Sequence, residues 1–243
     1  MTAASSSAGP GLYIALDTPD FDGACALTAA LAGTGAGIKL GKEFFTRHGP
    51  AGVRSVAGAH PLFLDLKFHD IPNTVAGAVR AACHLAPHLL TVHAAGGRAM
   101  MQAAAQAATA GAEDAGVPRP AVAAVTVLTS LDDADLAAAG QQPPVHEQVR
   151  RLATLAAEAG ADGVVCSPRE IAMLRTDLGA GMRLIVPGIR PDWAVANDQK
   201  RTLTPAEAVE AGADALVAGR PVTTAPDPAA AVRRILDEMA VAA

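Results

Sequence analysis

Lysines and aspartates stand at the ends of apolar segments, where folding could bring their side chains into one pocket. Asp65 and Lys67 lie two residues apart in the segment Leu62–Lys67. Asp70 follows shortly after, and Lys39 lies in a separate apolar segment. Residues two apart on a strand point to the same face, so Asp65 and Lys67 should share a pocket. A network of opposite charges can present a fixed cation to an anion that develops during a reaction.

The scarcity of lysine strengthens this interpretation. The chain has 19 Lys and Arg residues, and only four of them are lysine. A lysine ammonium can change its pKa and transfer a proton, whereas a guanidinium stays charged. Lys39 and Lys67 therefore predict acid–base or electrostatic chemistry. The alternative for these two lysines is a solvated surface position, and the alternative for the Asp–Lys network is a plain ion-pair ladder on the barrel rim. Lys42 and Lys200 fit a solvated surface better.

The elements that must position these side chains are short β-rich segments, each followed by a helical pattern. Their starts lie roughly 30 residues apart, the size of one βαβ unit. Most are continuously apolar, as expected for parallel strands buried on both faces. The eight segments are Leu12–Asp17, Gly37–Gly41, Leu62–Lys67, Leu89–Ala94, Val122–Thr129, Gly163–Ser167, Leu184–Gly188 and Ala215–Gly219.

Eight such units in 243 residues predict an α/β fold, a single (β/α)₈ TIM barrel spanning residues 12–243. Residues 1–11 are small and polar and predict a disordered tail. A doubly wound sheet is the alternative, but it usually has a Gly-rich turn after the first strand, and Leu16–Pro19 is not one. Ser167 and Thr204, each followed by Pro and then Glu at the third position, predict helix starts.

Composition excludes several classes of protein. A hydrophobic content of 51% argues against disorder. A net charge of −5 with 3% aromatic residues argues against nucleic-acid binding. No apolar run reaches the roughly 18 residues of a membrane span, and three scattered cysteines form no disulfide framework. We therefore expect a cytoplasmic protein that acts on a small molecule.

Two later segments predict a phosphate site. Residues 187–203 show no helix or strand periodicity and exceed the roughly 12–15 residues beyond which loops are usually functional. This segment contains Arg190 and Gln199 and predicts a lid; the alternative is an ordinary long crossover. Gly219 and Arg220 follow the last strand, where barrels commonly bind phosphate.

The segment Leu62–Val75 contains the pattern D-x-K-x-x-D-I-P-x-T. This pattern resembles the signature of the bacterial-type orotidine 5′-phosphate decarboxylase family. The similarity covers nearly the whole chain in the same order. Further matching segments are Ile14–Asp17, Ile38–Glu43, Val92–Gly97, Val127–Ser130, Pro187–Arg190, Asn197–Gln199 and Val217–Arg220.

The resemblance implies a barrel of the ribulose-phosphate-binding type and a decarboxylation that needs neither cofactor nor metal. It implies that orotidine 5′-phosphate loses CO₂ to give uridine 5′-monophosphate, the last step of de novo pyrimidine biosynthesis, with Lys67 as proton donor. The implied catalytic network is Lys39, Asp65, Lys67 and Asp70. The implied binding residues are Asp17 and Lys39 for the ribose, Thr129 for the pyrimidine, and Arg190, Gln199, Gly219 and Arg220 for the phosphate.

The resemblance also implies a homodimer, in which Asp70, Ile71 and Thr74 act in the neighbouring subunit's site. His69 and His93 stay outside the catalytic set. Two rivals remain. Related barrels with a D-x-K-x-x-D core, such as 3-keto-gulonate-phosphate decarboxylases and hexulose-phosphate synthases, use Mg²⁺ with a strand-2 Glu. Lys39 takes that position here. The other rival is a barrel without catalytic activity that binds nucleotides or serves as a scaffold. A scaffold, however, has no need of the complete charge network.

Overall fold

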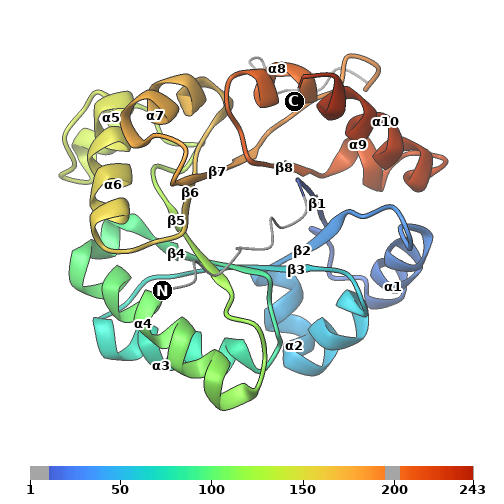
Figure 1. Cartoon of the computed structure of the whole chain (residues 1–243), viewed down its shortest axis with the longest axis horizontal. Coiled ribbons are helices and arrows are strands. Elements are labelled where there is room, and N and C mark those ends of the chain that lie inside the picture. Colours follow the sequence, from blue (N-terminus) through green and yellow to red (C-terminus); the bar gives the residue numbers. More distant parts are fainter. Residues whose placement is uncertain (1–10, 195–202, 243) are drawn as a thin grey trace, which may run out of the picture.

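Eight parallel strands pair in chain order and close into a barrel, with the helices outside the ring (Figure 1). The computed structural model describes residues 11–194 and 203–242. The predicted (β/α)₈ barrel is thereby confirmed. The strands are β1 (Leu12–Ala15), β2 (Gly37–Gly41), β3 (Leu62–Phe68), β4 (Leu89–His93), β5 (Ala121–Val125), β6 (Gly163–Val165), β7 (Arg183–Pro187) and β8 (Ala215–Ala218).

Helices follow the strands and form the outer layer. Side-chain caps start several of them, and Thr204 and Ser167 complete the predicted capping boxes with Glu207 and Glu170. No helix of the described ranges is long and apolar enough to cross a membrane. The helices are α1 (Phe21–Ala30), α2 (Lys42–Ala57), α3 (Pro72–Cys83), η1 (Ala94–Gly96), α4 (Gly97–Ala115), α5 (Asp133–Ala138), α6 (Val145–Glu158), η2 (Pro168–Glu170), α7 (Ile171–Leu178), α8 (Pro205–Glu210), α9 (Arg220–Thr223) and α10 (Pro228–Val241).

Several strands are shorter at the carboxyl end than the sequence predicts. The prediction for the fifth strand, Val122–Thr129, is wrong at that end because β5 stops at Val125. Its neighbour β6 stops at Val165, so the residues after Thr126 have no strand there to pair with. Asp17 and Thr129 thus lie in loops at the barrel mouth, where they can reach a ligand. Of the predicted tail, residues 1–10 lie outside the described residues.

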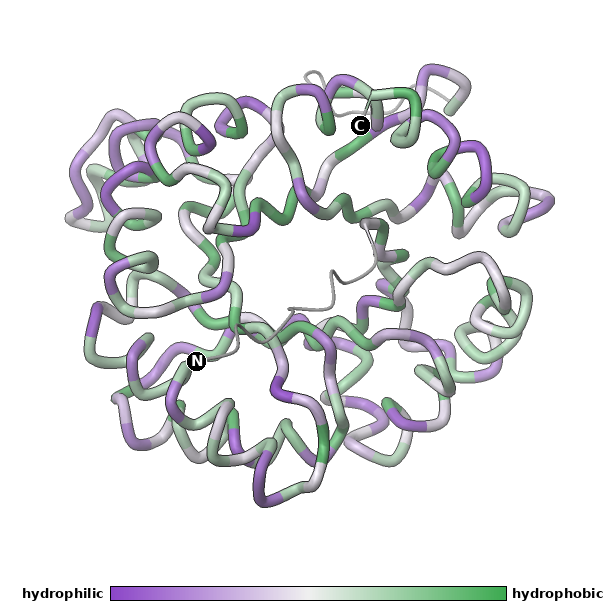
Figure 2. The backbone as a smooth tube through the Cα atoms, viewed as in Figure 1, coloured by the Kyte–Doolittle hydropathy of each residue, from purple (hydrophilic) through white to green (hydrophobic). Residues whose placement is uncertain are grey.

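Apolar side chains fill two layers, one inside the barrel and one between strands and helices. In Figure 2 the ring of strands is mainly hydrophobic, while hydrophilic segments lie on the outer helices. Inside the barrel, Tyr13 and Phe63 pack edge to face with ring centroids 5.3 Å apart. Because side chains alternate along a strand, Asp65 follows Phe63 on the inner face of β3. Lys39 on β2 is in register with Phe63, so the Lys39 and Asp65 side chains lie next to this apolar layer.

Candidate active site

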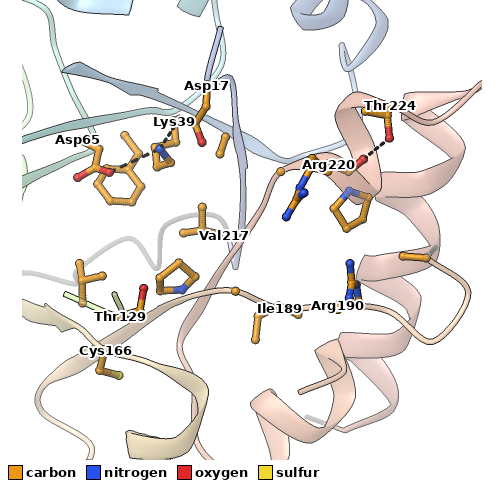
Figure 3. A pocket seen from close by; sticks show the side chains of 18 of the residues that line it. Asp17, Lys39, Asp65, Thr129, Cys166, Ile189, Arg190, Val217, Arg220 and Thr224 are labelled. Carbon is orange, nitrogen blue, oxygen red and sulfur yellow. Dashed lines mark hydrogen bonds and ion pairs between the residues drawn. The ribbon is translucent and has the colours of Figure 1, made fainter. Parts of the chain in front are cut away.

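An alternating row of charges runs across the carboxyl ends of the first three strands. The Lys39 ammonium lies 3.0 Å from Asp17 Oδ1 and 3.5 Å from Asp65 Oδ2. The Lys67 ammonium lies 2.7 Å from Asp65 Oδ2. Figure 3 shows Lys39 between the two carboxylates. The row Asp17–Lys39–Asp65–Lys67 is therefore continuous, with each cation next to an anion.

The middle of this row is buried and its ends are more open. Lys39 is 8% exposed and Asp65 is 9% exposed, whereas the side chain of Asp17 is 69% exposed. Burial alone raises the pKa of the Asp65 carboxyl. The charges of Lys39 and Lys67, and hydrogen bonds from Lys67 and Thr91, outweigh that effect and lower the pKa below its usual value. Asp65 is thus a permanent anion at neutral pH.

Thr91 belongs to this cluster, although sequence analysis did not select it. Its side chain is fully buried on β4, and its hydroxyl donates to Asp65 Oδ1 at 2.9 Å. The same hydroxyl oxygen accepts the backbone N–H of Lys67 at 2.9 Å. A polar residue within the apolar run Leu89–Val92 was the one available signal. The sequence of this run does not show which groups the Thr91 hydroxyl contacts.

The row of charges lines a cavity of about 600 Å³ at the barrel mouth. The other residues that line the cavity come from strands such as β8 and from loops that follow other strands. Thr129, in the loop after β5, lines the cavity as predicted. Val127, Ile189 and Val217 give it apolar walls. The predicted residues that line this cavity are Asp17, Lys39, Asp65, Lys67, Thr129, Arg190, Gly219 and Arg220.

Two arginines mark the other end of this cavity. Arg190 follows β7, and Arg220 begins α9 directly after Gly219. In Figure 3 their guanidinium groups point toward one another, on the opposite side of the cavity from Asp65. Guanidinium groups suit phosphate because they offer several donors in a planar fork. The cavity is therefore bipolar, with a Lys–Asp cluster at one end and two arginines, whose charge suits an anion, at the other.

The segment of residues 187–203, predicted to form a lid, is described only at its two ends. Gln199 and Lys200 lie outside the described residues. The two described ends of this segment are hydrogen-bonded: the backbone N–H of Arg190 donates to the carbonyl of Leu203 at 2.9 Å. Trp193 contacts α10: its indole N–H donates to Glu238 at 2.7 Å, and the Arg234 guanidinium lies 4.2 Å from the ring centre. These contacts fix the beginning of the segment; its function as a lid stays a prediction.

The second half of the signature lies outside the cavity. Asp70, Ile71 and Thr74 are exposed and are not among the cavity-lining residues, and Ile71 is 67% exposed. The Asp70 carboxylate accepts the backbone N–H of Ile71 at 2.6 Å. Within the described ranges no ion pair joins Asp70 to the row of charges. Their predicted role in a neighbouring subunit stays a prediction.

His69 and His93 form a pair beside the charged row, with ring centroids 5.5 Å apart. Burial, together with the nearby charges of His69, Lys42 and Lys67, lowers the pKa of His93 to about 4. His93 is therefore neutral at pH 7, which fits its place outside the catalytic set. Across residues 11–194 and 203–242, no cluster of His, Cys, Asp and Glu has the arrangement of a metal site.

Comparison with known proteins bears directly on the resemblance. A sequence model described as "Orotidine 5′-phosphate decarboxylase / HUMPS family" matches residues 10–235. The orotidine 5′-phosphate decarboxylase of Rhodospirillum rubrum is 57% identical over 94% of this chain and 93% of its own length. The orotidine 5′-phosphate decarboxylase of Thermobifida fusca is 52% identical over 94% of this chain and 95% of its own length.

Solved structures agree with these sequence matches. The crystal structure of orotidine 5′-phosphate decarboxylase from Lactobacillus acidophilus superposes with a TM-score of 0.83 at 35% identity, covering 95% of this chain and 99% of the other. An uncharacterized conserved protein from Geobacillus kaustophilus gives a TM-score of 0.81 at 37% identity, covering 94% and 99%. The family predicted from the signature is confirmed: this chain belongs to the orotidine 5′-phosphate decarboxylase / HUMPS family.

Proposed function

We propose that this protein decarboxylates orotidine 5′-phosphate to uridine 5′-monophosphate in pyrimidine biosynthesis, with Lys67 as the proton donor. The observation that carries the proposal is the bipolar cavity. A row of alternating charges, Asp17–Lys39–Asp65–Lys67, lines one end, and Arg190 and Arg220 line the other. A nucleoside monophosphate has the matching polarity, with a reactive ring at one end and a phosphate at the other.

The substrate binds with its phosphate toward the two arginines. Arg190 and Arg220 supply charge-assisted hydrogen bonds, and the Gly219 backbone and Gln199 complete the phosphate site. Asp17 and Lys39 bind the ribose hydroxyls, and Thr129 recognises the pyrimidine amide. This orientation puts C6 of the ring near Lys67 and the leaving carboxylate near Asp65. Binding energy from the remote phosphate then helps to orient the ring.

The reaction breaks the bond between C6 and the carboxylate carbon. CO₂ leaves, and the electron pair stays on C6 in an sp² orbital that the ring π system cannot delocalise. The Lys67 ammonium stabilises this charge by its position and then gives a proton to C6. One proton is consumed for each CO₂ released, and the neutral Lys67 amine recovers its proton from solvent. No covalent intermediate is needed.

Asp65 acts first as a positioning group. Its Oδ2 receives Lys67 at 2.7 Å and Lys39 at 3.5 Å, so one carboxylate holds both cations on the inner face of the barrel. Because Asp65 stays ionised, it would also repel the substrate carboxylate next to it, which disfavours the ground state. We assign most of the catalytic effect to the fixed ammonium groups of Lys67 and Lys39, and not to repulsion by Asp65.

The active unit is a cytoplasmic homodimer. Asp70, Ile71 and Thr74 lie at the start of α3, exposed and away from their own cavity. The Ile71 side chain is 67% exposed and is therefore accessible to a second subunit. In a two-fold dimer the same residues of each chain serve the other site. Asp70 then completes the charged row beside Lys67.

The direct test is to mix the purified protein with orotidine 5′-phosphate and follow the loss of pyrimidine absorbance. The assay is run with EDTA and a thiol reductant, and with 3-keto-gulonate 6-phosphate as an alternative substrate. Turnover of the nucleotide in EDTA supports the proposal. No turnover of the nucleotide, or activity lost on chelation, would overturn it in favour of a Mg²⁺-dependent relative.

A further inference from the structure

Strands β3 and β4 do not pair evenly where the charged row lies. Leu64 is in register with Leu90, but the next pair is Phe68 with Val92. Three residues of β3 therefore face one residue of β4, Thr91. Such a bulge disrupts the local ladder of backbone hydrogen bonds.

Within this bulge Lys67 has a backbone φ of 50°, in the left-handed region that side chains other than glycine rarely adopt. Residues held in this region need surrounding contacts that outweigh the strain, and such strain concentrates at functional sites. The backbone N–H of Lys67 is bonded to the Thr91 hydroxyl at 2.9 Å. A side chain thus replaces a ladder partner at the strained residue.

The same hydroxyl also orients the Asp65 carboxylate. It donates to Oδ1 at 2.9 Å, which leaves Oδ2 facing Lys67 and Lys39. A hydroxyl carries one donor and two acceptor positions, so it can make both contacts at once. Thr91 is 0% exposed and does not line the cavity. Thr91 therefore contacts Asp65 and Lys67 without facing the cavity.

We infer that Thr91 is a positioning residue for decarboxylation, which fixes the Lys67 backbone and the Asp65 carboxylate through one buried hydroxyl. This inference rests on the proposed roles of Lys67 and Asp65. It extends the charged row by a neutral residue from a fourth strand, which touches neither substrate nor product.

The chain offers a matched control in Thr126, the residue after β5. Thr126 is also buried, at 3% exposure, and its hydroxyl donates to the carbonyl of Val165 at 3.1 Å. Both threonines can be replaced by valine, which has nearly the same shape. Thr126→Val removes a buried hydroxyl that contacts only backbone. Thr91→Val removes one that contacts the charged row.

The experiment compares kcat, KM and the affinity for uridine 5′-monophosphate in Thr91→Val, Thr91→Ser, Thr126→Val and the wild type. Misplacing a reacting group by about 1 Å can cost 10²-fold, so we expect kcat of Thr91→Val to fall by about that factor. Product affinity should stay within about threefold, because the phosphate and ribose contacts remain. Thr91→Ser should recover most of kcat, and Thr126→Val should match the wild type.

A pH profile separates positioning from a general loss of structure. Asp65 faces Lys39 on β2, Lys67 on β3 and His93 on β4, and Asp17 lies beyond Lys39. The Thr91 hydrogen bond helps to lower the pKa of Asp65. Without that bond, the acid limb of the kcat/KM profile should move to higher pH in Thr91→Val and return in Thr91→Ser. The acid limb of Thr126→Val should not move.

Wild-type kcat in Thr91→Val, or an equal loss in Thr91→Ser and Thr126→Val, would overturn the inference. If Thr91→Val does not fold, Thr91→Cys gives the same test, since a thiol is a weak hydrogen-bond donor. Unimpaired kcat in that variant would also overturn it. Lys67→Ala is measured in parallel. Turnover by Lys67→Ala would refute the proposed proton donor, whereas inactive Lys67→Ala beside fully active Thr91→Val would refute only the role of Thr91.

Discussion

Asp65 and Lys67 lie two residues apart on β3, and their charged groups meet at 2.7 Å. On a regular strand, residues two apart stand about 7 Å from one another. Here the bulge opposite β4 and the left-handed backbone of Lys67 turn the lysine beside the carboxylate. The ammonium is therefore held in one place before any substrate arrives. Such preorganisation costs no rearrangement during the reaction.

Lys67→Ala removes the proposed proton donor. Proton transfer by a positioned group typically contributes 10²–10⁴-fold, and Lys67 also stabilises the carbanion, so we expect kcat to fall by at least about 10⁴-fold. Uridine 5′-monophosphate should still bind, because the phosphate end is untouched. Steady-state kinetics and product titration check both results.

Lys42→Ala is the matched control, since Lys42 is an exposed lysine at the start of α2 and does not line the cavity. Its kcat should stay close to the wild-type value. Wild-type turnover by Lys67→Ala would remove Lys67 from the mechanism.

Arg220→Ala tests the phosphate end. We expect kcat/KM for orotidine 5′-phosphate to fall by about 10²-fold or more, because a charge-assisted contact to phosphate is lost. The same substitution should hardly change the much slower reaction of orotidine, which has no phosphate. Arg151→Ala, an exposed arginine of α6, serves as the control and should leave both substrates unaffected. An equal loss with both substrates would contradict a phosphate role for Arg220.

His93 predicts a pH dependence of stability. Its pKa in the folded protein is about 4, below the value of 6.5 for an unperturbed histidine. The unfolded chain therefore binds the proton more readily, and this part of the stability is complete above pH 6.5. It is lost progressively as the pH falls from 6.5 towards 4.

Denaturant unfolding at several pH values checks this prediction. His93→Gln should lose less stability than the wild type between pH 6.5 and 4. His146→Gln, which alters an exposed histidine of α6, should behave like the wild type. Identical pH dependence in the wild type and His93→Gln would show that His93 is not the group responsible.

Mixing inactive variants tests the shared site. In the proposed dimer Lys67 and Asp70 of one site come from different chains, so a heterodimer of Lys67→Ala and Asp70→Ala contains one intact site. After random exchange half of the dimers are heterodimers, so activity should recover to about one quarter of the wild-type level. Lys67→Ala mixed with Asp65→Ala is the control. Both residues then belong to the same site of the same chain, and no activity should return. Failure of the first mixture to recover would contradict the trans arrangement.

The sequence by itself determined the barrel and the family. Both depend on local signals: apolar strand segments at regular spacing, capping residues such as Thr204, and an uninterrupted signature over Leu62–Val75. Strand pairing in a barrel follows chain order, so the carboxyl ends carrying Lys39 and Asp65 had to meet at one mouth.

Only the tertiary structure decided how the site is supported and which signature residues stand outside it. Thr91 meets Asp65 and Lys67 from a neighbouring strand because the register between β3 and β4 shifts there. Register shifts and left-handed residues arise from pairing between distant segments, and no local pattern records them. Likewise the start of α3 directs Ile71 away from its own cavity. One continuous motif is thereby divided between a first half that lines the cavity and a second half that is exposed outside it.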